Sequence, residues 1–201
     1  MHSKLAILAT LILLGFPLSS IASETSTPMA EEATIGQTYT RVYRRGSVST
    51  VQVVAEVIDT KEQAKSYLRD LREFVELGLE QELGGVDDLT VVDLESFPAE
   101  GFELTARHQL SYVYLHLITF IDENVVFTVF AMDINEERAD ELATETARFV
   151  HEADSGEAPI ELREEGTSTG GVFDRMPGKN DAVLEGYRSV EDMTGPVVPV
   201  N

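Results

Sequence analysis

The stretch that decides the fold is residues 101–132, which read GFELTARHQLSYVYLHLITFIDENVVFTVFAM. Nearly every residue from Tyr112 to Ile121 is apolar or aromatic, and a second apolar run, Val125 to Met132, follows Asp122-Glu123-Asn124. Because neither run has a helical period, we predict two adjacent antiparallel strands joined by a tight turn. Neither run alternates cleanly between apolar and polar residues, which indicates that helices cover both faces of the sheet.

The segment that leads into this hairpin, counted together with the hairpin's first arm, is too long to be one straight strand. Residues 102–121 would span about 66 Å if fully extended, more than a domain of this size accommodates. We therefore expect a bend, bulge or break between Arg107 and Ser111. A shorter strand is expected from Leu89 to Phe97, ended by Pro98.

A second hairpin is predicted nearer the N-terminus, from Thr38 to Ile58. Its turn is Arg45-Gly46-Ser47, where the glycine can adopt the positive φ that a tight hairpin favours. In its second arm the apolar residues recur with the period of two typical of a half-buried strand; they are Val51, Val53, Ala55 and Val57.

Two amphipathic helices are predicted. The first runs from Thr60 to Leu83, with Thr60 and Gln63 forming a capping box and Gly84-Gly85 ending it. The second begins after Asn135 as its N-cap, with Ile134 packing on Ala139 as a hydrophobic staple. The residues expected to be buried on the second helix are Ala139, Leu142, Ala143, Thr146, Phe149, Val150 and Ala153.

The first 22 residues, MHSKLAILATLILLGFPLSSIA, are typical of a secretory signal peptide. Lys4 precedes an apolar core, and Ser20-Ile21-Ala22 is the expected cleavage signal. The core of about 14 residues is shorter than the ~20 that span a bilayer, so cleavage is favoured over an uncleaved anchor. We therefore expect a secreted or periplasmic protein with no stable membrane span once the signal peptide is removed.

The formal net charge is −21, and the chain has no cysteine. Such a surface repels nucleic acid and anionic membranes, so we expect no nucleic-acid partner. It favours cations, basic partners or simple solubility, and a salty surrounding would screen its self-repulsion. Without disulfides, the core alone must hold the fold together.

The domain organisation follows from composition. Residues 23–37 are predicted to be a flexible leader, and residues 38–153 a single α+β domain, an antiparallel β-sheet with two main amphipathic helices packed on it. Residues 154–201 are rich in Gly and Pro and predict a largely disordered acidic tail. Within that tail, Tyr187 to Met193 could dock as a short element, but its sequence does not require regular structure.

Three segments within residues 38–153 resemble the Mog1/PsbP-like families, which include small exported bacterial domains related to DcrB. They are VSTVQVVAEVID (48–59), ENVVFTVFAMD (123–133) and ARFVHEA (147–153). The final Ser-Phe usual in those families is Arg148-Phe149 here. The resemblance implies an α/β/α sandwich and a mostly non-enzymatic role in binding or assembly.

No catalytic or metal-ligating residue can be selected from the sequence. His108 and His116 would lie about 26 Å apart in one extended strand, too far to share an ion, and His116 is expected to be a core residue. HExxH and Gly-x-Ser-x-Gly motifs are missing. The calcium-loop-like run 133–137 has Arg138 where a glycine is needed, so it is better explained as a helix start. We expect no cofactor, and an enzyme is less favoured than a binding protein.

The candidate binding residues are Arg41, Arg44 and Arg45, the only basic cluster in this acidic chain. They could bind an anion or an acidic partner at the hairpin tip, or they could pair with nearby glutamates of the chain itself. Four tyrosines on predicted strands could line a groove or simply pack in the core; they are Tyr39, Tyr43, Tyr112 and Tyr114.

Taken together, these features predict an exported soluble binding or assembly protein that acts through contacts with a protein of the envelope or secreted space. One alternative is a small secreted hydrolase or ligand-binding enzyme whose site is built from scattered residues. Another is an acidic surface protein with weak binding of calcium or another divalent cation.

Overall fold

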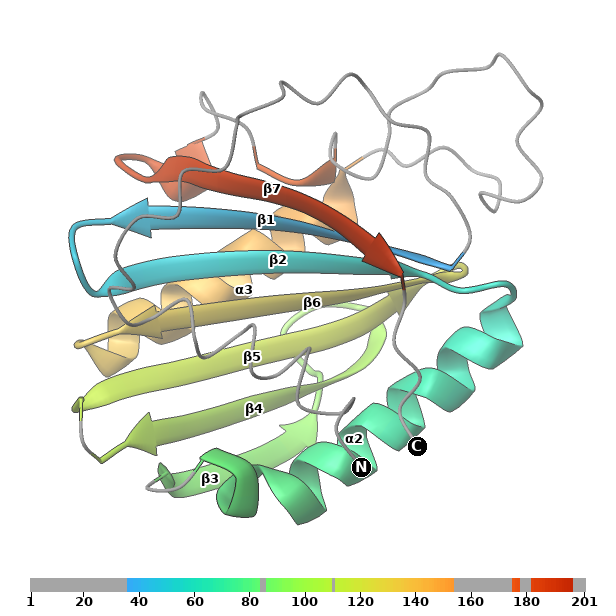
Figure 1. The fold of residues 1–201 in the computed structure, drawn as a ribbon, viewed down its shortest axis with the longest axis horizontal. Coiled ribbons are helices and arrows are strands. Elements are labelled where there is room, and N and C mark those ends of the chain that lie inside the picture. The colour runs from blue at the N-terminus through green and yellow to red at the C-terminus, as the bar shows by residue number, and fades with distance from the viewer. Residues whose placement is uncertain (1–35, 84–85, 110, 154–174, 178–181, 197–201) are drawn as a thin grey trace.

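The computed structural model describes residues 36–83, 86–109, 111–153, 175–177 and 182–196. Within these ranges, seven strands form one antiparallel sheet, in the order β3-β4-β5-β6-β2-β1-β7 (Figure 1). The elements are β1 (Gln37–Arg45), β2 (Ser49–Val57), α2 (Lys61–Leu83), β3 (Val86–Asp93), β4 (Glu100–His108), β5 (Val113–Asp122), β6 (Val125–Asp133), α3 (Glu136–Glu152), a short 3₁₀ helix η3 (Ala182–Leu184) and β7 (Arg188–Pro196).

The predicted central hairpin is confirmed. β5 and β6 pair antiparallel from Tyr114 opposite Asp133 to Asp122 opposite Val125. The turn between them has Glu123 at φ 52°, and the Asn124 side chain donates to the carbonyl of Ile58 at 2.7 Å. This amide therefore ties the central turn to the end of the first hairpin.

The expected break in the long segment is also present. β4 ends at His108 and β5 begins at Val113, with Tyr112 in the left-handed region at φ 54°. The first hairpin forms as predicted, with Gly46 at φ 67° in its turn. Thr60 accepts a hydrogen bond from the backbone nitrogen of Gln63 at 3.2 Å, as an N-cap does.

Alternate residues of the central strands belong to two separate buried clusters. Ile118, Phe120 and Phe127 pack with the inner residues of α3, whereas Leu117 and Val126 pack with those of α2. Successive side chains of a strand point to opposite faces, so the two helices lie on opposite faces of the sheet. In Figure 1, α2 lies in front of the strands and α3 behind them. The α+β class with an antiparallel sheet is therefore confirmed.

The second helix begins after Asn135, whose side chain accepts from the backbone nitrogen of Arg138 at 2.9 Å. Its inner face is close to the prediction, with Ala147 buried in addition and Phe149 and Ala153 only half-buried. Ile134 is exposed rather than packed as a staple residue.

Three boundaries differ from the sequence predictions. β3 begins three residues earlier than Leu89 and ends at Asp93, because Gly101 follows closely and the chain must already turn back into β4. β1 starts at Gln37, inside the predicted leader. The largest difference is β7, which pairs with β1 from end to end although residues 154–201 were expected to be a largely disordered tail.

The missed strand has a physical explanation. Its sequence, RSVEDMTGP, has no alternation and contains glycine and proline, so it has no strand signal of its own. The open edge of β1 supplies the hydrogen-bonding partners, which only the assembled sheet can provide. The predictions for residues 1–22, for most of the leader and for residues 154–174 fall outside the described residues.

None of the helices in the described part of the chain is both long enough and apolar enough to cross a membrane.

Candidate functional site

One end of the sheet gathers residues that are far apart in the sequence. At this end β1, β4 and β6 finish while β2, β5 and β7 begin, as shown by the opposed pairs Arg44–Arg188, Tyr114–Asp133 and His108–Val113 (Figure 1). We call this end the sheet rim, and its exposed residues include Arg45, Val48, Tyr112, Ile134 and Arg188. From β7 to β4 the rim spans five strand spacings, about 24 Å.

Large apolar side chains are exposed along this rim. The exposed fractions are 40% for Val48, 66% for Tyr112 and 61% for Ile134. These three come from the β1–β2 turn, the β4–β5 connection and the β6–α3 connection. Each lies in a connection between two elements, and such connections run over the surface of a domain. Away from the rim, the described residues of this kind include Leu77 on α2 and Val92 on β3.

The side chain of Arg107 lies beside the exposed ring of Tyr112. The Arg107 guanidinium carbon lies 5.6 Å from the ring centre of Tyr112 and 5.7 Å from that of Tyr114, distances typical of cation–π contacts. The other two tyrosines considered for a groove, Tyr39 and Tyr43, are buried in the core on the α3 side. The four tyrosines therefore do not line one groove, and Tyr112 is the exposed one.

The structure splits the three predicted binding arginines. Arg41 and Arg45 share the side of β1 that faces α3, and Arg44 points to the other side. Arg41 stands opposite Asp192 of β7, about 13 Å along the strand from Arg45. Arg41 and Arg44 both have interactions within the chain. The rim arginines among the three predicted ones are therefore Arg44 and Arg45.

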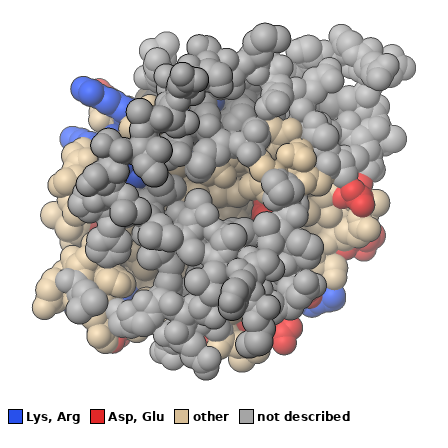
Figure 2. Space-filling model, viewed as in Figure 1, with Lys and Arg blue, Asp and Glu red and all other residues tan. Residues whose placement is uncertain are grey.

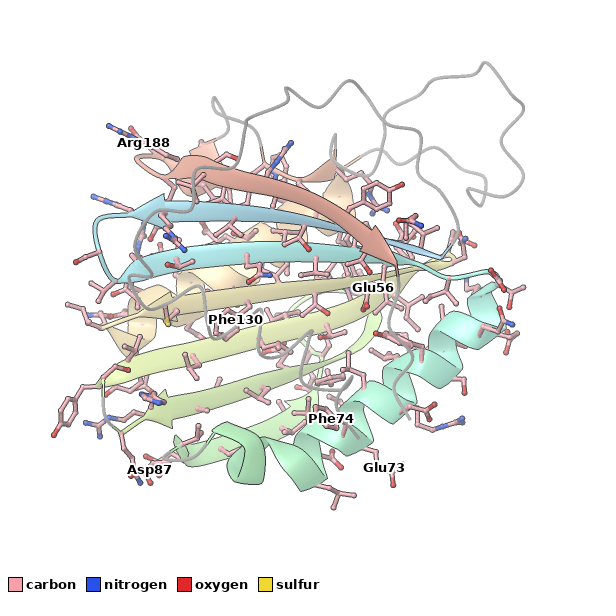
Figure 3. All side chains as sticks on the ribbon, viewed as in Figure 1. Glu56, Glu73, Phe74, Asp87, Phe130 and Arg188 are labelled. Atoms are coloured by element: carbon pink, nitrogen blue, oxygen red, sulfur yellow. The ribbon has the colours of Figure 1, made fainter. Side chains whose placement is uncertain are left out.

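β7 adds a basic residue that the sequence analysis did not select. Arg188 is directly opposite Arg44 on the neighbouring strand. Lysine and arginine side chains gather at the upper left of Figure 2, where Figure 3 labels Arg188. Sequence analysis marked residues 187–193 only as a segment that could dock, and it did not select Arg188, because the position opposite Arg44 follows from the pairing of β7 with β1.

A hydrogen-bonded cluster supports the rim from beneath. The Ser49 hydroxyl contacts both the Asp133 carboxylate and the Tyr187 hydroxyl. Asp133 also accepts from the backbone nitrogen of Asn135 at 3.0 Å, just before α3 begins. The cluster therefore joins the starts of β2, α3 and β7 to the end of β6 and fixes the rim loops relative to one another.

A second polar cluster lies between the sheet and α3, with His116 buried and Asp140 largely exposed. The imidazole of His116 lies with Nδ1 2.7 Å from an Asp140 oxygen and Nε2 3.5 Å from a Glu103 oxygen. Neither approach has hydrogen-bond alignment, so we regard both as electrostatic contacts. Burial lowers the pKa of His116, while the two carboxylates act in the opposite direction. Burial thus disfavours the charged imidazole, and His116 is a core residue, as the sequence predicted.

This cluster does not form a nucleophile–base pair. The Ser96 hydroxyl donates to Glu103 at 2.8 Å rather than to His116, and His116 is only 3% exposed. His108 lies on the opposite side of the sheet from His116, and its ring contacts the Ser111 hydroxyl at 2.8 Å. The two histidines are therefore not brought together, and a hydroxyl is not aimed at either buried imidazole nitrogen.

A third polar contact lies on the α2 side of the sheet. The Tyr67 hydroxyl of α2 donates to a carboxylate oxygen of Glu56 on β2 at 2.7 Å. Burial raises the pKa of Glu56 to about 7, while the hydrogen bond from Tyr67 acts to lower it. Burial and the neighbouring carboxylate also raise the pKa of Tyr67 above its ordinary value. Figure 3 places Glu56 beside the N-terminal half of α2, so this pair links helix and sheet.

Neither a metal site among the described residues nor a similar known protein identifies a function for this chain. Within the described ranges, no three His, Cys, Asp or Glu side chains are arranged to hold a metal ion. The run 133–137 serves as the start of α3, as its sequence suggested. No known family model matches the chain, and no curated protein sequence is significantly similar to it.

Proposed function

We propose that this chain is an exported, soluble binding or assembly protein that acts through protein–protein contacts, and that the sheet rim is its contact surface. We further propose that its sheet and helices form an α/β/α sandwich of the Mog1/PsbP-like kind. The observation that carries the functional proposal is the composition of the rim, where Val48, Ile134 and Tyr112 are exposed and arginines stand at the β1–β7 corner and beside Tyr112.

The rim has the chemistry of a protein interface. Aromatic residues and arginine are enriched at interface cores, whereas lysine, aspartate and glutamate are depleted there. Tyrosine and arginine are also frequent among the few residues that contribute most of the binding free energy. Here the Arg107 guanidinium lies 5.6 Å from the ring centre of Tyr112, so a partner would meet an aromatic and a cationic group side by side.

The buried polar clusters favour binding over hydrolysis. In the cluster around His116, the Ser96 hydroxyl is committed to Glu103, and the imidazole is closed off from substrate. A hydrolase would need its hydroxyl or a water within reach of the base. The hydrolase alternative therefore has less support than the binding proposal.

Site-specific photo-crosslinking in the producing cell tests the proposal. A photoreactive phenylalanine analogue replaces Tyr112 in one variant and Val92 in another, because both native side chains are exposed but only Tyr112 lies on the rim. We expect one discrete crosslinked partner at the Tyr112 position, and loss of that product when Ile134→Asp is added, since a charge at an apolar contact disrupts binding.

The control at the Val92 position should give no such product. Equal crosslinking at both positions would show that the rim is not a specific contact surface for a partner protein. Persistence of the Tyr112 product in the Ile134→Asp variant, with the fold intact by circular dichroism, would likewise contradict the proposal.

A further inference from the structure

We propose that the arginine corner of the rim, made of Arg44, Arg45 and Arg188, recognises an acidic segment of the partner protein through its carboxylates. This inference rests on the proposed function and deepens it, because it names the chemistry that the partner must present. The occupant is an extended protein segment with at least two neighbouring Asp or Glu residues.

The geometry places guanidinium groups on both sides of one sheet edge. Arg44 and Arg188 are opposed on neighbouring strands and point to the same side, with strands about 5 Å apart. Arg45 follows Arg44 and points to the other side, toward the face that α3 covers. A segment passing over the end of β1 and β7 can therefore meet one guanidinium on each side.

The Arg45 side chain packs against the backbone of Gly186. A Cβ atom added at Gly186 would stand 3.7 Å from both Cζ and Nε of Arg45, so the guanidinium lies directly over this backbone. The glycine has φ +82°, which other residues rarely adopt. The backbone just before β7 thus orients the Arg45 side chain in the absence of a partner. A guanidinium group that is already oriented loses less conformational entropy on binding.

Electrostatics favours an anion at this corner. Like charges directly opposite on neighbouring strands are destabilising, and Arg44 faces Arg188 in that way. Arg44 has interactions within the chain, whereas Arg45 and Arg188 are exposed and form no ion pair with any residue that the structure describes. An incoming carboxylate can therefore accept hydrogen bonds from the planar guanidinium groups of Arg45 and Arg188.

The rest of the molecule favours carboxylates over a dense polyanion. The chain carries a formal charge of −21, so its net charge repels a long nucleic acid or sulfated polymer that extends beyond the corner. A protein segment brings only a few charges and can also place apolar groups against Tyr112 and Ile134 farther along the same rim. An acidic protein segment therefore fits the rim better than a polymer of uniform charge.

A labelled peptide of alternating glutamate and alanine tests the inference by fluorescence anisotropy with the intact mature chain. We expect saturable binding to wild type and about tenfold weaker affinity for each of Arg45→Gln and Arg188→Gln, since each removes a charge-assisted hydrogen bond. The matched control is Arg148→Gln, which removes one exposed arginine from α3 and should bind like wild type. Circular dichroism checks that all variants are folded.

Three results would overturn the inference. They are the absence of peptide binding by wild type, equal weakening by Arg148→Gln, and equal or tighter binding of a sulfated polysaccharide of similar charge through the same arginines. Peptide failure alongside a specific crosslink at Tyr112 would reject the carboxylate partner and leave the proposed function standing. Peptide binding through the corner without any rim crosslink would support this inference while removing the broader proposal.

Discussion

At the scale of single residues, burial decides what each ionisable group does. Glu56 is only 1% exposed and has one identified polar contact, the Tyr67 hydroxyl. His116 is similarly buried but lies between two carboxylates. The desolvation that raises the pKa of the acid lowers the pKa of the imidazole, because burial penalises whichever form is charged.

The Glu56 carboxyl should make stability fall as the pH rises. Its pKa is raised from 4.5 to about 7, so the folded state holds a proton that the unfolded chain has already released. This contribution to stability is complete below pH 4.5 and is lost as the pH passes through about 7. We expect Glu56→Gln to remove the loss, which is on the order of 3 kcal/mol, as measured by urea unfolding at pH 5 and pH 8.

The matched control is Glu73→Gln on the exposed side of α2, which should leave the pH dependence of wild type unchanged. A Glu56→Gln variant whose stability relative to wild type is the same at both pH values would show that this carboxyl does not carry the linkage.

At the scale of elements, one glycine allows β4 to lie against β5. A Cβ added at Gly101 would stand 2.2 Å from the carbonyl oxygen of Thr119, a backbone atom that cannot rotate away. Gly101 is opposite Phe120 in the paired strands, so the close approach lies near the start of β4, where β4 pairs with β5. A side chain there must push the strands apart.

We expect Gly101→Ala to destabilise the fold by about 3 kcal/mol, the upper end of what overpacking typically costs, because the atom it meets is backbone. The measurement is the urea midpoint, with Gly195→Ala on the edge strand β7 as control, because nothing lies within 4 Å of a Cβ there. Equal midpoints for the two variants would mean that β4 and β5 do not approach this closely.

At the scale of the whole molecule, net charge opposes compactness. With a formal charge of −21, the folded chain repels itself, and salt reduces that repulsion as the Debye length falls from about 10 Å at 0.1 M to about 3 Å at 1 M. Salt should therefore stabilise the fold while weakening any contact between the arginine corner and an acidic partner.

We expect the free energy of unfolding to increase by about 1 kcal/mol across that salt range, the scale of a few surface charge interactions. Sodium and potassium chloride should act alike, because screening does not depend on which monovalent ion supplies it. If the free energy of unfolding did not change with monovalent salt but increased with calcium, the cation-binding alternative would be favoured instead.

The sequence by itself determined the central part of the fold. Period-two and period-3.6 patterns are local, and so are the caps at Thr60 and Asn135 and the glycine turn at Gly46; each was therefore predictable within a few residues. The long apolar run even implied the break before Val113, from length alone.

Only the tertiary structure decided the candidate site. The rim is assembled from the ends of six strands, and pairings such as Arg44 with Arg188 follow from sheet order rather than from spacing along the chain. Residues 188–196 form a strand because the unpaired edge of β1 can hydrogen-bond to them. Tyr112 and Ile134 are exposed because they lie in connections at the same end of the sheet. Local sequence encodes hydrogen-bonding and burial preferences, but which distant segments meet depends on the whole sheet.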